Sequence, residues 1–192
     1  MAVTYGQAHA LASKRLSAGS LAHSERVAEE ADRLAGLYGV DSSEARLAGI
    51  LHDLCRDTPH DELVGAAVAA GIPITDVDRA VPYLLHGPVA AAELAEMIPG
   101  LSPEVIEAVR SHTYGGTTLS PLAMIVYVAD VSEPGRPHES SALLRSRAGS
   151  VSLAELFASA YAASMHHLID NRRLIHPATL STWNDIVLRE RA

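Results

Sequence analysis

The sequence contains one cysteine, Cys55, in a chain of 192 residues. A single cysteine cannot form a disulfide within the chain, and it excludes the paired cysteines of a zinc ribbon or a dithiol redox motif. The chain also lacks an apolar run of the roughly 20 residues that a membrane-spanning helix needs, and its first residues lack the apolar core of a secretory leader. We therefore expect a cytoplasmic protein, in a reducing compartment, that has no membrane partner.

Basic and aromatic residues are also scarce. The 15 Lys and Arg residues are outnumbered by 23 Asp and Glu residues, which gives a formal net charge of −8. A nucleic-acid-binding surface holds phosphates with clustered Lys and Arg, so this charge argues against nucleic acid as a partner. One Phe and one Trp stand against ten His residues, a ratio that favours metal chemistry over aromatic stacking.

The hydrophobic pattern predicts helices along nearly the whole chain, because alternating β-branched runs are rare. Ser, Asp, Pro and Gly mark the expected starts and ends of these helices. The expected helices span residues 20–38, 42–55, 59–71, 87–97, 103–112, 121–131, 152–170 and 178–190, with loops at 112–121 and 132–141. The 48% hydrophobic content suffices for one core. We predict an all-α, single-domain bundle of about eight to ten helices over residues 1–192.

Ionisable residues interrupt or close several apolar stretches. His52 and Asp53 follow the run "RLAGIL", where burial of an unpartnered polar group costs several kcal/mol. The same pattern recurs at His23, His86, His112 and Asp130. One cation shared by several of these side chains would compensate their burial, and mixed imidazole and carboxylate ligands suit a divalent ion such as iron, manganese or zinc.

Arg56 lies four residues after His52 and three after Asp53, on the same face of a helix. The three residues form a candidate site for a metal ion and a phosphate group. Each residue alone has a simpler interpretation: the dipeptide occurs by chance, and a single His23 or Asp130 fits an exposed helix position. The combination favours the metal site.

The order His23, His52-Asp53, Asp130 resembles the H…HD…D pattern of the HD superfamily of metal-dependent phosphohydrolases. The stretches "LAHSERVAEEADRLA", "AGILHDLCRDTP", "LLHGPVAAAELAE" and "VRSHTYGGTTLSPLAMIVYVADVSEPGR" together resemble the YqeK family, the HD-type symmetrical dinucleoside tetraphosphatases. These motifs lie between residues 20 and 136. Residues 140–192 are similar mainly in length and helical character.

Three positions depart from the usual sequence of that family. Arg56 stands where Lys is usual, "HTYGG" stands where "HTTG" is usual, and Val131 replaces an aromatic residue. Arg binds phosphate as Lys does, and more rigidly, so the first change should be tolerated. The other two changes affect the wall of the pocket and leave the nucleobase preference open.

The resemblance implies an HD-type helical bundle that hydrolyses diadenosine tetraphosphate symmetrically to two ADP, by attack of a metal-bound hydroxide. It implies one or two divalent ions, iron in related proteins. The ligands of the first ion would be His23, His52, Asp53 and Asp130. His86 and His112 would face the same pocket, as ligands of a second ion or as donors to phosphate.

The chemistry of phosphoryl transfer suggests roles for the remaining residues. A divalent ion lowers the pKa of a bound water and neutralises phosphoryl oxygens, and Asp53 is the candidate to position the resulting hydroxide. Arg56 and Arg136 suit bidentate contact with phosphate. Either His86 or His112 can protonate the leaving ADP, since histidine titrates near neutral pH, and the sequence does not choose between them.

Two hydroxyl residues complete the expected site. Ser20 and Thr113 lie at predicted helix ends beside expected ligands, where they would add hydroxyl or backbone contacts to the phosphates. Tyr83 and Tyr114 have two equally open interpretations, stacking on a nucleobase or packing within the protein.

Two other functions stay open. The metal ligands define the chemistry but not the substrate, so a nucleoside monophosphate, a cyclic nucleotide or another phosphoester is an alternative. The other alternative is a nucleotide-binding sensor without turnover, although the four intact metal ligands argue against it. A homodimer also stays open, because the predicted helix over 178–190 has an apolar face that either closes the core or meets a second copy.

Overall fold

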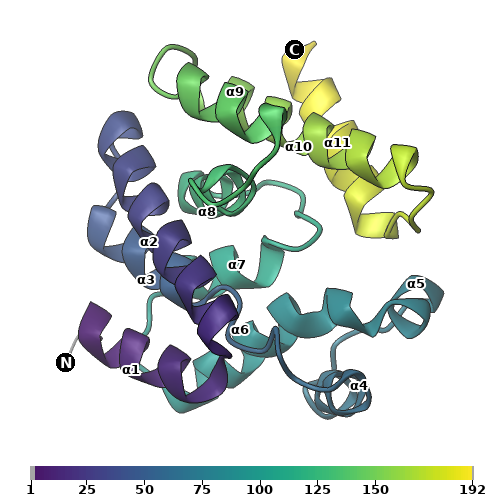
Figure 1. The fold of residues 1–192 in the computed structure, drawn as a ribbon. Coiled ribbons are helices and arrows are strands. Elements are labelled where there is room, and N and C mark those ends of the chain that lie inside the picture. Colours follow the sequence, from purple (N-terminus) through teal and green to yellow (C-terminus); the bar gives the residue numbers. More distant parts are fainter. Residues whose placement is uncertain (1–2, 192) are drawn as a thin grey trace.

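The structure is a computed structural model that describes residues 3–191. This part of the chain forms eleven α-helices and one short 3-10 helix, with no strand (Figure 1). The elements are α1 (Tyr5–Arg15), α2 (Ala18–Tyr38), α3 (Ser42–Leu51), α4 (His60–Ala69), α5 (Asp76–Ala80), η1 (Pro82–Leu85), α6 (His86–Met97), α7 (Pro103–Ser111), α8 (Pro121–Ser132), α9 (Glu139–Arg147), α10 (Leu153–Asp170) and α11 (Pro177–Glu190). The all-α prediction is confirmed, with one helix more than the range of eight to ten.

Three of these helices, α1, α5 and α9, were not among those expected. Capping boxes start α1 and α5, where the side chains of Thr4 and Thr75 accept hydrogen bonds from the backbone N–H groups of Gln7 and Asp78. α9 begins inside the predicted loop over 132–141. It buries only Ser141 and Leu144, so its sequence carries little of the apolar periodicity that marks a helix.

α3 is shorter than the predicted helix over 42–55. It ends at Leu51, and residues 52–57 continue as turns with hydrogen bonds from Leu54 N to Leu51 O and from Arg56 N to Asp53 O. His52 and Asp53 therefore lie on tight turns beyond the helix. Arg56 and Asp53 are three positions apart in the sequence. The turns direct both side chains to the same side, so Arg56 still reaches Asp53.

α2 and α3 pack closely side by side (Figure 1). The contact depends on Gly49, because a Cβ atom at this position would lie 2.6 Å from the Cα of Ala28. The close approach of the two helices brings the rings of His23 and His52 to a centroid distance of 5.5 Å. The packing of small residues thus sets the geometry of the polar cluster.

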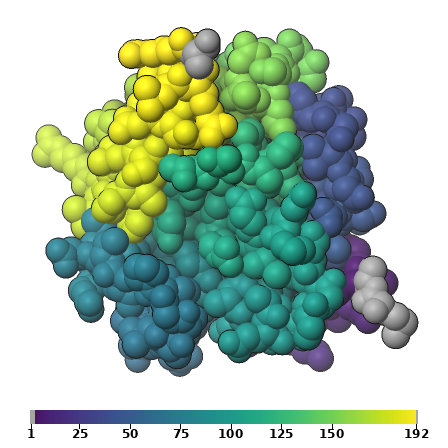
Figure 2. Space-filling view, turned by 180° about the vertical axis from the view of Figure 1, so that it is seen from behind, coloured from purple at the N-terminus to yellow at the C-terminus, as the bar shows by residue number. Residues whose placement is uncertain are grey.

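α8 lies in the middle of the bundle, in contact with α2, α3, α7, α9 and α10 (Figure 1). Most of its side chains are buried, and Asp130 lies near its C-terminal end. Seen from behind, the C-terminal segment lies against the segment that follows α7 (Figure 2). Thr182 of α11 approaches the carbonyl of Tyr114 in that segment, at 3.4 Å. In the described residues no helix is both long and apolar enough to cross a membrane.

Candidate metal and phosphate site

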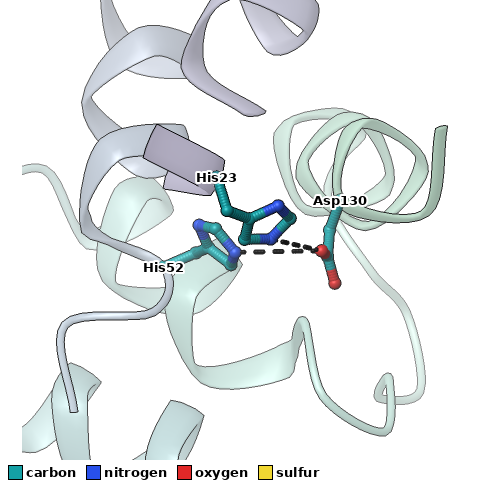
Figure 3. A group of neighbouring side chains, drawn as sticks. All are labelled: His23, His52 and Asp130. Atoms are coloured by element: carbon teal, nitrogen blue, oxygen red, sulfur yellow. Dashed lines mark hydrogen bonds and ion pairs between the residues drawn. The ribbon is translucent and has the colours of Figure 1, made fainter. Parts of the chain in front are cut away.

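Three side chains from distant parts of the sequence converge at the centre of the bundle (Figure 3). His23 from α2 places Nε2 3.0 Å from Oδ1 of Asp130 on α8. His52, directly after α3, places its Nε2 4.0 Å from the same oxygen. Both histidines are almost inaccessible to solvent. The arrangement gathers two imidazole nitrogens around one carboxylate.

Asp53 joins this cluster to a second pair of histidines. Its Oδ2 lies 3.3 Å from His52 Nε2 and 3.6 Å from His23 Nε2. Its Oδ1 lies 3.0 Å from His86 Nε2 and 3.5 Å from His112 Nε2. One carboxylate oxygen therefore faces each pair, and the structure brings together all six residues that interrupt or close apolar stretches in the sequence.

Backbone carbonyls fix the orientation of three of these imidazole rings. In each case Nδ1 lies within hydrogen-bond distance of the carbonyl three residues earlier: 2.7 Å for His52 and Gly49, 2.6 Å for His86 and Tyr83, and 2.8 Å for His112 and Val109. A carbonyl only accepts, so Nδ1 carries the proton, and Nε2 of a neutral ring presents a lone pair to the cluster. Metal-binding histidines are usually oriented in this way.

The cluster has the properties that a divalent ion requires. The Nε2 atoms of His86 and His112 lie 2.9 Å apart, where two lone pairs repel unless a proton or a cation lies between them. The buried atoms His52 Nε2 and Asp53 Oδ1 have no hydrogen-bond partner, which is costly unless a ligand compensates. Two sets of ligand atoms lie within 4.8 Å of one another: His23, His52 and Asp130, and His52, Asp53 and His112. Nitrogen and oxygen donors in this number suit a divalent transition metal.

The carboxylates of the cluster are ionised. Burial would raise the pKa of Asp53, but the positive charge of His52 when it is protonated, and hydrogen bonds that His112, His52 and His86 can then donate, lower it well below its usual value. Burial acts on Asp130 in the same way, and the hydrogen bond from His23 and the nearby charges lower the pKa of its carboxyl far below the usual range. Both groups are therefore negative at neutral pH, as metal ligands must be.

Glu133 is a member of the site that the sequence analysis did not identify. Its Oε1 lies 3.1 Å from Nδ1 of His23, and its carboxylate accepts hydrogen bonds from Arg26 Nε at 2.6 Å and Gly135 N at 2.5 Å. Its side chain is 2% exposed, so these contacts replace water entirely. No local signal marks it, because Glu133 follows the end of α8 at Ser132 and its partner His23 lies 110 positions away in the sequence.

A cavity of about 410 Å³ opens next to the cluster. Its lining includes all but one of the expected catalytic and substrate-binding residues, namely Asp53, Arg56, His86, His112, Thr113 and Arg136. Arg56 donates to Asp53 Oδ2 at 2.6 Å, and Arg136 donates to Asp130 Oδ1 at 2.5 Å. The hydroxyl of Thr113 is buried and has no hydrogen-bond partner. Cationic groups thus lie between the metal ligands and the open cavity.

Ser20 is the expected substrate-binding residue that this lining does not include. Its hydroxyl donates to Oδ1 of Asp57 at 2.9 Å, and Asp57 also accepts from the backbone N–H of Ser17 at 2.7 Å. In this structure Ser20 has a structural contact, because Asp57 ties the start of α2 to the turns after α3, and the expected phosphate contact stays a prediction.

Comparisons with known proteins agree with this geometry. The family model described as "HD domain" matches residues 20–135. The chain is 29% identical to the symmetrical bis(5'-nucleosyl)-tetraphosphatase of Halalkalibacterium halodurans over 97% of this chain and 98% of that protein. It is 35% identical to the protein of the same name from Staphylococcus aureus over 68% of this chain and 66% of that protein.

A solved structure has the same fold. The crystal structure of a predicted HD superfamily hydrolase involved in NAD metabolism from Clostridium acetobutylicum superimposes with a TM-score of 0.89, at 29% identity. The superposition covers 98% of this chain and 100% of that one. The histidines and aspartates follow one another in the order of the H…HD…D pattern, on a helical bundle, and the HD domain model matches residues 20–135. The chain therefore belongs to the HD-domain family.

Proposed function

We propose that the protein is a metal-dependent symmetrical dinucleoside tetraphosphatase, which hydrolyses diadenosine tetraphosphate to two ADP. The substrate class comes from the relatives, which carry the name symmetrical bis(5'-nucleosyl)-tetraphosphatase. The observation that carries the chemistry is Asp53, which lies between two pairs of histidines and contacts Arg56 at the edge of the cavity. This arrangement combines a cation site with a phosphate site.

The residues proposed to hold the divalent ion are His23, His52, Asp53 and Asp130, with His86 and His112 as donors to a second ion or to phosphate. When bound, such an ion lowers the pKa of water and neutralises phosphoryl oxygens. We propose iron, in one or two ions per chain, because the resemblance to the YqeK family implies it; the imidazole and carboxylate ligands suit iron but also manganese. We also propose a cytoplasmic location, since the single cysteine, Cys55, cannot form a disulfide within the chain, as is usual in a reducing compartment.

The protein side chains bind and orient the phosphate chain. Arg56 and Arg136 each use one nitrogen for a carboxylate of the cluster, which leaves other guanidinium N–H groups for phosphate oxygens. Thr113 offers a buried hydroxyl beside them. These donors hold a central phosphorus next to Asp53, so that negative charge developing on the phosphoryl oxygens is stabilised.

Hydrolysis forms a bond from the oxygen of water to one of the two central phosphorus atoms and breaks its bond to the oxygen that bridges them. That oxygen leaves on ADP and needs a proton. His86 and His112 border both the cluster and the cavity, and a protonated Nε2 on either one can donate it. Asp53 is proposed to orient the attacking water.

The test uses protein purified without added metal. Elemental analysis is combined with chromatography of the products from diadenosine tetraphosphate. We expect one or two metal ions per chain and ADP as the sole product, and Asp53→Ala should lose both metal and turnover. Faster release of phosphate from a nucleoside monophosphate than of ADP from the tetraphosphate would favour the alternative substrates. Binding without turnover, after metal is supplied, would favour a sensor.

A further inference from the structure

Tyrosines are concentrated around the cavity. The chain has only six Tyr, one Phe and one Trp, and Tyr83, Tyr114, Tyr127 and Tyr161 all line this one space. Tyr127 and Tyr161 are buried and stack on each other at a centroid distance of 5.1 Å, so they form part of the core. Tyr83 and Tyr114 are half-buried and border the open space. These two are the candidates for contact with a bound planar group.

The two half-buried tyrosines differ in their neighbours. The ring of Tyr83 lies 4.6 Å from the His86 ring and 5.6 Å from the guanidinium of Arg56, so two residues of the proposed catalytic site already cover it. The ring of Tyr114 has one aromatic neighbour, His176, with centroids 4.3 Å apart and planes 18° apart. Tyr114 is therefore backed on one face by a parallel ring.

His176 is held firmly behind Tyr114. Its Nδ1 accepts the backbone N–H of Ala178 at 3.1 Å, so its Nε2 carries the proton and donates to Oδ2 of Asp78 at 3.2 Å. Asp78 is buried and also accepts from the N–H and hydroxyl of Thr75. Both ring nitrogens of His176 are thus occupied, which fixes the plane on which Tyr114 stacks.

The backbone of Tyr114 is fixed as well. Its carbonyl accepts a hydrogen bond from the Tyr161 hydroxyl at 2.7 Å, and Thr182 Oγ1, which donates to the carbonyl of Ala178 at 2.9 Å, lies 3.4 Å from it. Tyr114 follows His112 by two residues, so the ring lies at a fixed place beside the proposed cleavage site. An aromatic ring that is held before binding loses little conformational entropy when a ligand stacks on it.

We propose that Tyr114 is the stacking platform for one nucleobase of the substrate, and that His176 and Asp78 are positioning residues behind it. This inference rests on the proposed function and deepens it by naming the base contact. Stacking requires only a planar face, so the platform accepts both purines and holds the larger purine face better than a pyrimidine. It adds a contact that does not involve the charges that bind phosphate.

The test compares steady-state kinetics of Tyr114→Ala and Tyr114→Phe on diadenosine tetraphosphate. We expect Tyr114→Ala to raise KM about 5- to 150-fold, the range that loss of one base stack produces, with a much smaller change in kcat. Tyr114→Phe keeps the ring and should stay within about 3-fold of the parent protein. Inorganic tripolyphosphate, which has no base, serves as a competitive inhibitor, and its inhibition constant should be the same in all three proteins.

Variants of His176 test the backing ring. His176→Ala should raise KM in the same direction as Tyr114→Ala, whereas His176→Phe, which retains a stacking ring but not the hydrogen bonds that hold it, should restore KM in part. Failure of His176→Phe to restore KM would overturn the positioning role. If Tyr114→Ala does not fold, Tyr114→Leu replaces it, because leucine fills the volume without offering an aromatic face.

The results separate this inference from the proposed function. Normal ADP release with an unchanged KM in Tyr114→Ala overturns the platform and leaves the function in place. An equal loss of affinity for tripolyphosphate also overturns it, because the effect would then not involve the base. If the parent protein releases no ADP, calorimetric binding of ADP that weakens in Tyr114→Ala, with pyrophosphate binding unchanged, supports the platform without the tetraphosphatase activity.

Discussion

The Nδ1 atom of His23 lies 3.1 Å from Oε1 of Glu133, whereas His52, His86 and His112 direct Nδ1 to backbone carbonyls. A carboxylate behind a metal-binding histidine fixes the tautomer and increases the basicity of the ligand nitrogen. Burial would raise the pKa of Glu133, but Arg26, the N–H of Gly135 and His23 lower it below its usual value. Glu133 is therefore a charged acceptor for His23.

Glu133→Gln should weaken metal binding about 10- to 100-fold, because the neutral amide orients His23 less strongly. The measurement is competition between metal-free protein and a chelating dye for Mn²⁺. Glu29→Gln is the control, since Glu29 is exposed on the same helix as His23. Equal affinities for the variant and the control would show that Glu133 does not act through His23.

Gly135→Ala should weaken metal binding in the same direction. A Cβ atom at this position would lie 2.6 Å from Arg26 Nε and 2.8 Å from Glu133 Oε2, so the pair must shift away from its present place. Gly36→Ala is the matched control on α2, because a Cβ atom there meets nothing within 4 Å. The dye competition assay applies again, and a metal affinity equal to that of Gly36→Ala would contradict the prediction.

Arg56→Ala should lower kcat/KM for diadenosine tetraphosphate by about 10²- to 10³-fold, as expected for loss of one preorganised donor to the reacting phosphate. Arg56→Lys should recover part of this loss, because lysine keeps the charge but not the bidentate geometry. Arg189→Ala, at an exposed ion pair with Asp185, is the control. Initial rates of ADP formation measure all three, and an unchanged rate in Arg56→Ala would remove it from the site.

His86→Gln and His112→Gln should identify the group that protonates the leaving ADP. The variant that lacks this group should lose about 10²- to 10⁴-fold in kcat. A general acid works only when protonated, so the parent protein should lose activity at alkaline pH. This alkaline limb should be absent from one variant. Its persistence in both pH profiles would exclude the two histidines as the acid.

Asp57→Asn should lose stability in a pH-dependent manner. Slight burial raises the pKa of Asp57, but the hydrogen bonds from Ser17 and Ser20 lower it below its usual value of 3.8. Ionised Asp57 therefore stabilises the folded state above that value, and the contribution disappears as pH falls through the lower, folded pKa. Urea unfolding should separate the variant from the parent protein at neutral pH and much less at about pH 3. Equal differences at both pH values would contradict this role.

The all-α class and the identity of the central residues could be predicted from the sequence. Burial of His52, Asp53 and Asp130 after apolar runs requires compensation, and this physical requirement holds whatever the packing. His23 was a candidate only because, like these three residues, it is an ionisable side chain that interrupts an apolar stretch. The caps of several helices could also be predicted, but α1 was not expected despite its capping box at Thr4.

Contacts between distant segments could not be predicted in this way. Glu133 lies in a stretch rich in Gly and Pro, and its partnership with His23 joins residues 110 positions apart. The hydrogen bond from Ser20 to Asp57 joins residues 37 positions apart. Neither pairing leaves a periodic signal in the sequence.

The sequence by itself determined which side chains need compensation when buried, because desolvation of a charge costs free energy wherever it occurs. Only the tertiary structure decided which of them lie together. The approach of α2 to α3 at Gly49 brings His52 to His23, and the turns after α3 set Asp53 between the histidine pairs. The stack of Tyr114 on His176 likewise exists only because α11 packs against the segment after α7. Such distances depend on the packing of whole helices, which no local pattern specifies.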